Sequence, residues 1–422
     1  MSNCVIKKIV YSISVDLMSP LCISKGDGIL TDNDVLVNGE GIPFVPGSSL
    51  AGAMRGYIEK DKQQECIFGY ENMHTNEGQM SSLFVSDLFF EGAVCTAVRD
   101  GVRLSDKKAA MTKGKFDMEV IDTGTTGCFY MELVIRQKDD EKTLLEQLDQ
   151  VFLGWREKEI RLGSKKSRGY GEVCLLDVKK KVFDSSNILE YKDAYCDVKQ
   201  QDDTWETVNL TEKEADKTKY ITITLPLRLE GGISIRQYGA RKNEPDFVHI
   251  TANGKPVIPG TSFAGAIRHR LKEILEQLGA VNRADIIDNI FGYVNENDEK
   301  KERVSNILIG ECVLENSKRL IMVRNGISRF EAGAKDSALF KEASYIGGTT
   351  TLEIKVKKTE EADETIGLLL LVLRDVQNGL LAVGGQTAVG RGLFTTDGEL
   401  CVHTQQSIEK YMKAAYTALR RE

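Results

Sequence analysis

The chain contains one block of sequence twice, and this repetition limits its fold more than any other feature. Residues 43–55 read PFVPGSSLAGAMR, and residues 256–268 in the second half read PVIPGTSFAGAIR. Shorter echoes follow both blocks in the same order, such as the Ile-Phe-Gly-Tyr segments at 67–70 and 290–293. A duplicated block of this length, with ordered echoes after it, predicts two tandem copies of one domain.

Length and composition agree with two globular domains. The 422 residues suit two domains of roughly 200 residues, each large enough to bury its own core. An apolar content of 41% and a charged content of 28% are ordinary for a globular protein. No apolar run reaches the ~20 residues that a membrane span needs. The N-terminus also lacks the layout of a secretory signal, so we expect a cytoplasmic location.

The cysteines, the histidines and the net charge argue against several classes of function. The nine cysteines form no CxxC pair, which favours reduced core residues. The four histidines are too scattered for a zinc site. A net charge of −7 argues against a free-standing nucleic-acid binder. Basic residues nevertheless gather in 103–115 and 156–168, so we expect a local basic groove on an acidic body.

Apolar periodicity indicates the same order of elements in both halves. Each expected opening strand is followed by a glycine-rich polar loop, a first helix, one or two middle strands, a second helix, a loop and a closing strand. The opening strand, the two helices and the closing strand are expected at 9–17, 50–58, 142–154 and 172–178 in the first half, and at 221–228, 263–274, 363–378 and 392–402 in the second. This order predicts an α+β fold of two tandem ferredoxin-like (RRM-like) domains. The expected domains are 1–180 and 219–422, joined by a charged linker at 181–218.

A glycine-rich loop ends each copy, at 163–171 and 384–392. Glycines permit positive φ, and consecutive amides form an anion-binding nest that suits a phosphodiester backbone. The alternative is a tight helix-to-strand turn. The candidate RNA-binding residues here are Gly163, Lys165, Lys166, Arg168, Gly385 and Arg391.

The duplicated block predicts a second phosphate site, at a helix N-terminus. Ser48 and Ser49 are natural N-caps in the first copy, as are Thr261 and Ser262 in the second. The alternative is capping alone. Arg55 and Arg268 fall off the apolar stripe and are further candidates for phosphate contact.

Acidic residues in the loop after each opening strand are the candidate catalytic groups. The first copy offers Asp27, Asp32 and Asp34, and the second offers Glu244 and Asp246. A loop carboxylate can hold a divalent cation or orient a ribose 2′-hydroxyl for in-line attack. The alternative is that these aspartates only form turns.

These residues together resemble the RAMP superfamily of CRISPR proteins, which acts in antiviral defence. The resemblance is to the backbone subunit of type III (Csm/Cmr-type) effector complexes, and the tandem arrangement resembles a type III-D-like fusion. It rests on the opening strand, the Pro-Gly-Ser-Ser-Leu block, the Phe-Gly after the first helix and the closing glycine-rich loop. It covers nearly the whole chain except the linker.

The resemblance implies a ferredoxin-like palm with a β-hairpin thumb insertion in each copy. It implies binding of a CRISPR guide RNA (crRNA) and cleavage of a complementary target RNA by an endonuclease site that uses a divalent metal, expected to be Mg²⁺. The implied partners are a large subunit, further RAMP subunits and a small subunit, with no membrane. Sequence is then read by base pairing.

The resemblance also implies roles for individual residues. The catalytic aspartate of the family lies three positions before a valine; taking Val35 as that valine gives Asp32, with Asp34 as the second candidate. Taking Val248 as the matching valine gives Pro245, so Asp246 serves only if the loop shifts by one. Asp32 and Asp246 are the implied metal ligands. Arg329 belongs to the implied RNA contacts, and the implied thumb residues are Met111, Phe116, Leu339 and Phe340, for which ordinary packing is the alternative.

Four functions follow in descending order. The first is a metal-dependent endoribonuclease within the multi-subunit complex, with copy one better supported than copy two. The second is a non-catalytic guide-RNA scaffold of the same complex. A guide-processing endonuclease ranks third, because such enzymes often use a histidine for acid–base catalysis and neither His74 nor His249 has a counterpart in the other copy. An interaction protein without nucleic acid ranks last.

Overall fold

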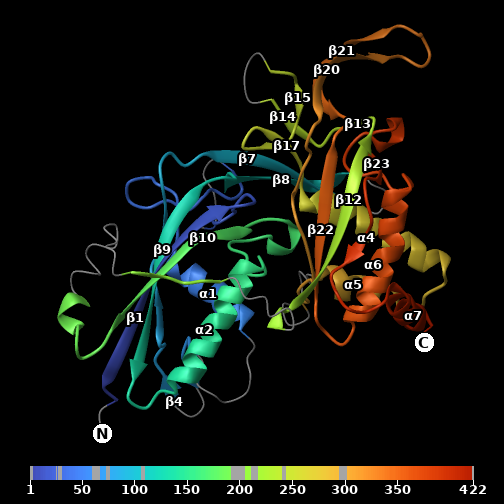
Figure 1. Ribbon diagram of the computed structural model, residues 1–422. Coiled ribbons are helices and arrows are strands. Elements are labelled where there is room, and N and C mark those ends of the chain that lie inside the picture. Colours follow the sequence, from blue (N-terminus) through green and yellow to red (C-terminus); the bar gives the residue numbers. More distant parts are fainter. Residues whose placement is uncertain are drawn as a thin grey trace. The chain divides into compact units, whose positions relative to one another are not determined.

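The computed structural model describes most of the chain as mixed α+β structure (Figure 1). The described residues are 3–24, 26, 31–58, 67–72, 77–105, 110–191, 205–210, 217–239, 244–293 and 302–420. They form two compact units. The first consists of 1–98, 118–166 and 171–218, and the second of 99–117, 167–170 and 219–422. The second unit therefore includes two short segments from the first half of the sequence. The expected domain and linker boundaries stay a prediction.

An antiparallel sheet with two helices on one face forms the first unit. The strands of the sheet path are β11 (Glu206–Thr207), β10 (Val173–Phe183), β1 (Val5–Leu17), β9 (Thr126–Arg136), β6 (Leu88–Phe90) and β2 (Phe44–Val45), in that order, with β5 (Leu83–Val85) also on β9. Alternate residues of β1, such as Ile13 and Val15, are buried with the apolar stripes of α1 (Gly47–Tyr57) and α2 (Glu141–Arg156). The expected strand and both helices are confirmed here.

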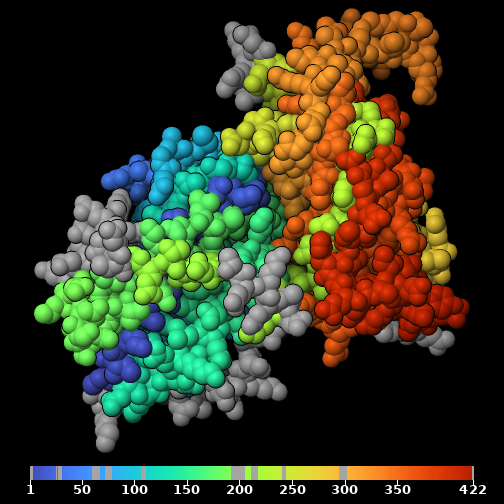
Figure 2. Space-filling view, viewed as in Figure 1, coloured from blue at the N-terminus to red at the C-terminus, as the bar shows by residue number. Residues whose placement is uncertain are grey.

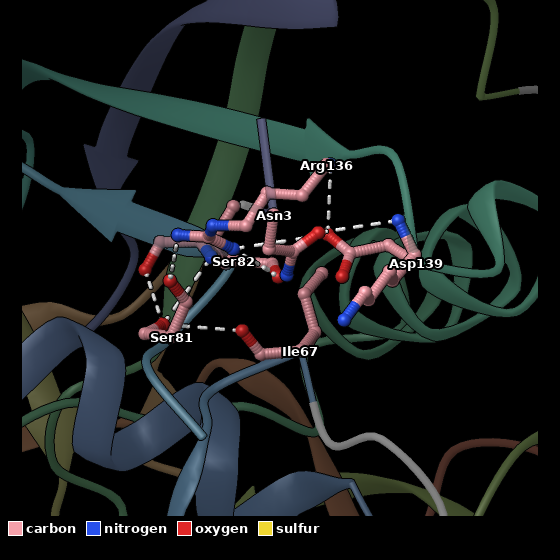
Figure 3. Close-up of polar contacts among 8 residues, drawn as sticks. Asn3, Ile67, Ser81, Ser82, Arg136 and Asp139 are labelled. Atoms are coloured by element: carbon pink, nitrogen blue, oxygen red, sulfur yellow. Dashed lines mark hydrogen bonds and ion pairs between the residues drawn. The ribbon is translucent and has the colours of Figure 1, made fainter. Parts of the chain in front are cut away.

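Hydrogen bonds join the end of β9 to the loop before β5 (Figure 3). The Arg136 guanidinium donates to the Ser82 hydroxyl at 3.0 Å and to the Ser81 carbonyl at 3.3 Å. The Asp139 carboxylate accepts from the Arg136 amide at 2.8 Å. These contacts satisfy polar groups at the start of the turn into α2. The helix itself is capped by Asp140, whose carboxylate accepts from the Lys142 amide.

The second unit repeats this design. Its main sheet follows the order β18 (Ile307–Ile309), β22 (Thr349–Lys357), β12 (Tyr220–Glu230) and β23 (Leu393–Thr396), with β24 (Cys401–Val402) also on β12. The helices are α4 (Gly260–Gln277), α5 (Arg283–Phe291), α6 (Ala362–Gln377) and α7 (Ile408–Leu419). Leu225, Phe263 and Leu369 meet in one core. The expected closing strand is two short strands, and Pro226 lies between their pairing sites on β12.

Short strands and one long hairpin complete the second unit. The strands are β13 (Gly232–Ile233), β14 (Arg236–Tyr238), β15 (Phe247–His249), β16 (Thr251–Ala252), β17 (Lys255–Ile258) and β19 (Cys312–Val313). The hairpin consists of β20 (Lys318–Ile327) and β21 (Ala334–Ile346). Figures 1 and 2 show its tip, in orange, projecting from the second unit. In the first half, β7 (Thr96–Leu104) pairs with β8 (Ala110–Ile121), and this hairpin occupies the place in the first repeat that β20–β21 occupies in the second.

Three remaining expectations concern the linker, the cysteines and membranes. The start of the expected linker continues β10 to Phe183 and then forms a 3₁₀ turn at Ile188–Glu190. Its remainder, apart from 205–210 and 217–218, lies outside the described residues. The described cysteines are all free thiols. None of the helices in the described ranges is long and apolar enough to cross a membrane.

Candidate nucleic-acid interface

Three arginines from separate motifs converge within the second unit. Arg103 comes from β7, Arg168 from the first glycine-rich loop and Arg268 from α4, and all three side chains are exposed. Partial burial lowers the pKa of Arg168 most, and the nearby positive charges of Arg268 and Arg103 lower it further. Since a guanidinium stays protonated, this repulsion marks a local excess of positive charge. We call Arg103, Arg168 and Arg268 the arginine cluster.

Two glycines allow the arginine cluster to form. A Cβ on Gly260 would lie 2.7 Å from the Arg168 carbonyl oxygen, which is closer than van der Waals contact permits. Gly169 has φ +95°, and a Cβ there would lie 2.9 Å from the Glu311 amide nitrogen. Only glycine fits at both positions, so the loop carrying Arg168 lies directly against the first turn of α4. Arg268 and Arg168 were expected RNA contacts, whereas Arg103 belonged only to the basic stretch at 103–115.

The duplicated block starts its helices differently from expectation. The N-caps are Pro46 and Pro259, and the helices already begin at Gly47 and Gly260, with no side-chain cap. The expectation that the serines and threonine cap these helices is therefore wrong. A proline pre-sets φ at a helix start without needing a side-chain acceptor.

The hydroxyl residues of both blocks instead lie in the first helical turn. Ser48 is exposed, whereas Ser49, Thr261 and Ser262 are half-buried. In the first copy the Gly47 amide donates to the Asp87 carboxylate at 2.7 Å, so an anion already lies at this helix start. Arg55 is exposed in the last turn of α1.

Some backbone amides of the glycine-rich loops donate hydrogen bonds to other segments of the chain. The Ser164 amide donates to the Cys22 carbonyl at 2.8 Å, and the Gly385 amide donates to the Ser234 carbonyl at 2.9 Å. The Gly385 amide therefore ties the loop to the strand that follows the opening strand. Gly163 is half-buried with φ +72°. These bonds anchor each loop to the segment that follows the opening strand, and the Lys166 side chain is exposed.

Lys165 and Gln386 occupy equivalent left-handed positions in the two loops, with φ of 55° and 58°. The Lys165 ammonium lies 3.2 Å from the Met118 sulfur. The Gln386 amide nitrogen instead donates to the Glu342 carboxylate at 2.9 Å. Glu342 thus stands in the second copy where the first copy has Met118.

The candidate aspartates differ in their surroundings. Asp34 is buried and accepts from the Thr31 amide and hydroxyl, both at 2.9 Å, as a turn-forming aspartate does. Asp32 is exposed, and Asp246 is exposed but accepts from the Lys341 amide at 2.7 Å. Asp27 lies outside the described residues.

Hydrogen-bond register aligns the two aspartate loops. The Leu36 amide donates to the Ile23 carbonyl, and the Ile250 amide donates to the Ile235 carbonyl, each at 3.0 Å. Counting back the same number of residues from Leu36 and Ile250 reaches Asp32 and Asp246. The alignment through Val248, which gave Pro245, is therefore off by one residue. A two-residue difference between the loops hid this equivalence in the sequence.

The candidate aspartate sites provide few protein ligands for a metal ion. Across the described ranges, no group of three His, Cys, Asp or Glu side chains could hold a metal ion. One exposed carboxylate, such as that of Asp32, fits Mg²⁺ only where RNA phosphates and waters supply the other ligands, which is a common arrangement for this ion. The donor set does not fit a metal held by protein alone.

Comparison with known proteins identifies the chain's family. The RAMP superfamily model matches residues 14–174 and 221–395, which is most of the chain and both copies. The chain belongs to the RAMP superfamily. No curated protein matches it. RAMP domains are associated with CRISPR-related RNA-binding complexes, and the two matched regions confirm two tandem RAMP domains.

The hairpins of the two RAMP regions place their candidate thumb residues alike. Leu339 and Met111 are exposed, at 65% and 45%. Phe340 packs edge-on against Phe247, and the Phe116 ring fills the space beside Gly101. Each hairpin therefore has one exposed and one packed candidate, and the thumb role of all four residues stays a prediction.

Sequence reasoning missed a more exposed aromatic residue in the second RAMP hairpin. Phe330 is 96% exposed at the turn between β20 and β21, beside the exposed Arg329. An aromatic residue flanked by Arg329 and Glu331 in a turn was the available signal.

Buried charge around Glu342 was missed as well. Burial would raise the pKa of Glu342, but hydrogen bonds from Arg236, Ser234 and Gln386 lower it to about 2. Arg236 donates to this carboxylate at 2.9 Å, and Arg324 lies 3.8 Å from it. We call Arg236, Arg324, Arg391 and Glu342 the second-copy charge patch.

Proposed function

We propose that this chain is the tandem backbone subunit of a type III CRISPR effector complex, which binds guide RNA and cleaves complementary target RNA. The arginine cluster carries this proposal. It gathers positive charge from three separate motifs on an otherwise acidic chain, and the loop that carries Arg168 lies against the first turn of α4. Phosphodiesters are recognised by arginines and helix N-termini in this combination.

The fold supports the same proposal. The order β10-β1-β9, with β5 also on β9, matches the order β23-β12-β22-β18, so equivalent strands occupy the same places in the two sheets. In this proposal each sheet serves as a ferredoxin-like palm, because the opening strand lies between the closing strand and the third strand. The β7–β8 and β20–β21 hairpins would serve as the thumbs.

Binding is tested with the guide-loaded complex and the R168E variant. We expect R168E to weaken guide-RNA binding at least tenfold and to lower the slope of log affinity against log salt by about one phosphate contact. R319E is the matched control, because Arg319 is an exposed arginine on β20 outside the arginine cluster. Equal loss in both variants, or in neither, would count against the arginine cluster as an RNA site.

Cleavage is assigned to Asp32 and Asp246, which occupy equivalent positions beside the sheet. In this proposal the 2′-oxygen of the target attacks the adjacent phosphorus, and the bond to the 5′-oxygen breaks. The products are a 2′,3′-cyclic phosphate and a 5′-hydroxyl. A Mg²⁺ ion held by each aspartate together with target phosphates would stabilise the negative charge of the transition state.

End-labelled complementary RNA tests this assignment. In the assembled complex with Mg²⁺, D32A and D246A are each expected to remove one distinct product while target binding persists. E40A, which changes an exposed acid in the loop of the first copy, should leave both products. Unchanged products in the double variant would show that these aspartates are turn residues.

A non-catalytic scaffold is the second candidate, and one observation favours it for the second copy. The Asp246 carboxylate accepts from the Lys341 amide, which anchors it to β21. Loss of the Asp32 product alone, with no product assigned to Asp246, would support one cleaving copy and one scaffold copy.

A further inference from the structure

The Glu342 carboxylate accepts hydrogen bonds from three separate segments of the second unit. Its Oε1 accepts from the Ser234 hydroxyl at 2.7 Å and from the Arg236 guanidinium at 2.9 Å. Its Oε2 accepts from the side-chain amide of Gln386, in the second glycine-rich loop, at 2.9 Å. A hydroxyl, an amide and a guanidinium are donors with which proteins bind the oxygens of a phosphodiester. Glu342 is 0% exposed, so its carboxylate fills the place where these donors converge.

The charge around this carboxylate suits an anion. Within the described ranges, the ion pairs of Arg236 and Arg324 are with Glu342 alone. Arg391 is 9% exposed and donates to the Ser344 hydroxyl at 3.1 Å. Burial lowers the pKa of Arg391 most, and the charge of Arg324 lowers it further, while Glu342 opposes both effects. Without Glu342, the second-copy charge patch would hold three guanidinium groups and no carboxylate.

Other contacts hold two of these arginines in place independently of Glu342. The guanidinium carbon of Arg236 lies 4.8 Å from the centroid of the Phe247 ring, where a cation is attracted by the ring face. A Cβ on Gly232 would collide with Nη1 of Arg391, so this guanidinium lies directly against the Gly232 backbone. The donors should therefore stay in place when a neutral side chain of the same size replaces Glu342.

The first glycine-rich loop is built differently at the equivalent place. Met118 stands where the second copy has Glu342, and its sulfur lies 3.2 Å from the Lys165 ammonium. Aligning the two loops through their glycines places Arg168 opposite Val389. Arg168 is exposed, and Val389 is 66% exposed. The first loop thus presents a cation where the second presents an apolar side chain.

We propose that Glu342 occupies the phosphate site of the second glycine-rich loop, so that an RNA phosphate binds the first loop and is excluded from the second. This inference rests on the proposed RNA binding by the chain. An anion entering the second loop would meet a buried carboxylate and be repelled. Because the pKa of Glu342 is about 2, the carboxylate stays charged at physiological pH and the exclusion is permanent. Glu342 determines which loop contacts RNA and is not a catalytic residue.

Inorganic sulfate tests, without RNA, whether Glu342 fills an anion site in the purified full-length chain. E342Q keeps the size of the side chain and removes its charge. E342Q is expected to melt at a lower temperature than wild type, because buried donors lose a charged acceptor. The comparison therefore uses the shift that sulfate causes in each chain at constant ionic strength. Sulfate should raise the Tm of E342Q by about 2 °C more than that of wild type.

E276Q is the matched control for this measurement. Glu276 is an exposed acid in the last turn of α4, and the substitution makes the same change of charge and shape. The Tm shift of E276Q with sulfate should equal that of wild type. An equal gain in E342Q and E276Q would show a general effect of net charge and would overturn the proposal.

Guide-RNA binding by the assembled complex tests whether the emptied site accepts a phosphate. E342Q should tighten binding about threefold or more and steepen the dependence of log affinity on log salt by about one phosphate contact. M118E places a carboxylate beside Lys165 in the first loop and should have the opposite effect, with about tenfold weaker binding. E276Q should bind guide RNA as wild type does.

Three results would overturn the proposal. If sulfate shifts E342Q no more than wild type, the donors around Glu342 form no anion site. If E342Q leaves guide-RNA binding unchanged, the RNA does not reach this loop. If E342Q weakens binding and flattens its salt dependence, Glu342 positions arginines that already hold a phosphate. The R168E test concerns the arginine cluster and the sulfate test needs no RNA, so this inference and the proposed function can fail separately.

Discussion

At the scale of single residues, glycines differ in what their missing side chains do. Around Gly52 and Gly265 no atom lies within 4 Å of an added Cβ, so nothing in the described chain requires glycine there. A Cβ on Gly47 would lie 2.8 Å from the Ser86 carbonyl oxygen and would collide with it. The duplicated glycines inside these helices therefore leave open surface, and the ones at the helix starts permit close packing.

This difference predicts opposite effects of two alanine substitutions in α1. G52A should raise the free energy of unfolding by up to ~1 kcal/mol, because alanine is the better helix former. G47A should lower it by about 2 kcal/mol through overpacking against β5 and its turn. Urea denaturation measures both. If G52A also weakens guide-RNA binding by the complex, RNA lies against this face of α1; unchanged binding argues that the face is bare.

His249 predicts a pH dependence. Its ring is 2% exposed; Nδ1 accepts from the Ile235 amide at 3.0 Å, and Nε2 lies 3.0 Å from the Val257 carbonyl oxygen. Burial lowers the pKa of His249 from 6.5 to about 4, and the hydrogen bond to Val257 opposes this effect only in part. Protonation would place a hydrogen on Nδ1, where the ring must accept.

The sign follows from proton binding by the unfolded chain. Between pH 6.5 and about 4 the unfolded state binds this proton and the folded state does not, so stability falls as pH falls. The total loss is on the order of 3 kcal/mol. Denaturation of wild type and H249Q at several pH values checks this: the variant should lose less stability over that window. Parallel pH profiles would contradict it.

At the scale of elements, the glycine-rich loops combine left-handed backbone with close packing. Gly392 has φ +74°, and an added Cβ would collide with the Val383 carbonyl oxygen. Gly390 has φ +80° but no atom within 4 Å of an added Cβ. Substitution of Gly390 therefore tests backbone strain alone, and substitution of Gly392 tests backbone strain together with a steric clash.

Alanine scanning of this loop should show that separation. G390A should cost about 1 kcal/mol, from the left-handed backbone alone. G392A should cost about 3 kcal/mol or more, because the collision with backbone adds to the same strain. Thermal unfolding of the two variants compares them directly. Equal destabilisation would mean that the loop moves to admit the side chain.

At the scale of the whole molecule, the second compact unit includes 99–117 and 167–170 from the first half of the sequence. The buried pair of Arg99 and Glu311 belongs to this unit. The two halves of the sequence therefore do not correspond to two separately completed units.

Splitting the chain should show this dependence. Fragments 1–218 and 219–422, co-expressed with a tag on one of them, should purify together. R99E should abolish their co-purification, because two buried acids would then face each other. R103E, an exposed charge reversal on the same strand, is the control and should permit co-purification. Fragments that never associate, or that associate equally with R99E, would contradict this role of the ion pair.

The amino-acid sequence alone predicts the tandem architecture, the order of strands and helices in each copy and the two apolar helix stripes. These features depend on local periodicity and on duplication, both of which are visible in a single chain. It did not determine how the helices begin, because Pro46 and Pro259 supply the geometry that the neighbouring hydroxyl residues were expected to supply.

The folded chain shows which distant side chains meet, and the sequence does not. Arg103, Arg168 and Arg268 converge although long stretches of sequence separate them, and Asp246 aligns with Asp32 only through hydrogen-bond register. Contacts of this kind depend on strand pairing and burial between remote segments, and periodicity within one segment carries no information about them. The same reason explains why the pair of Arg99 and Glu311 is visible only in the folded chain.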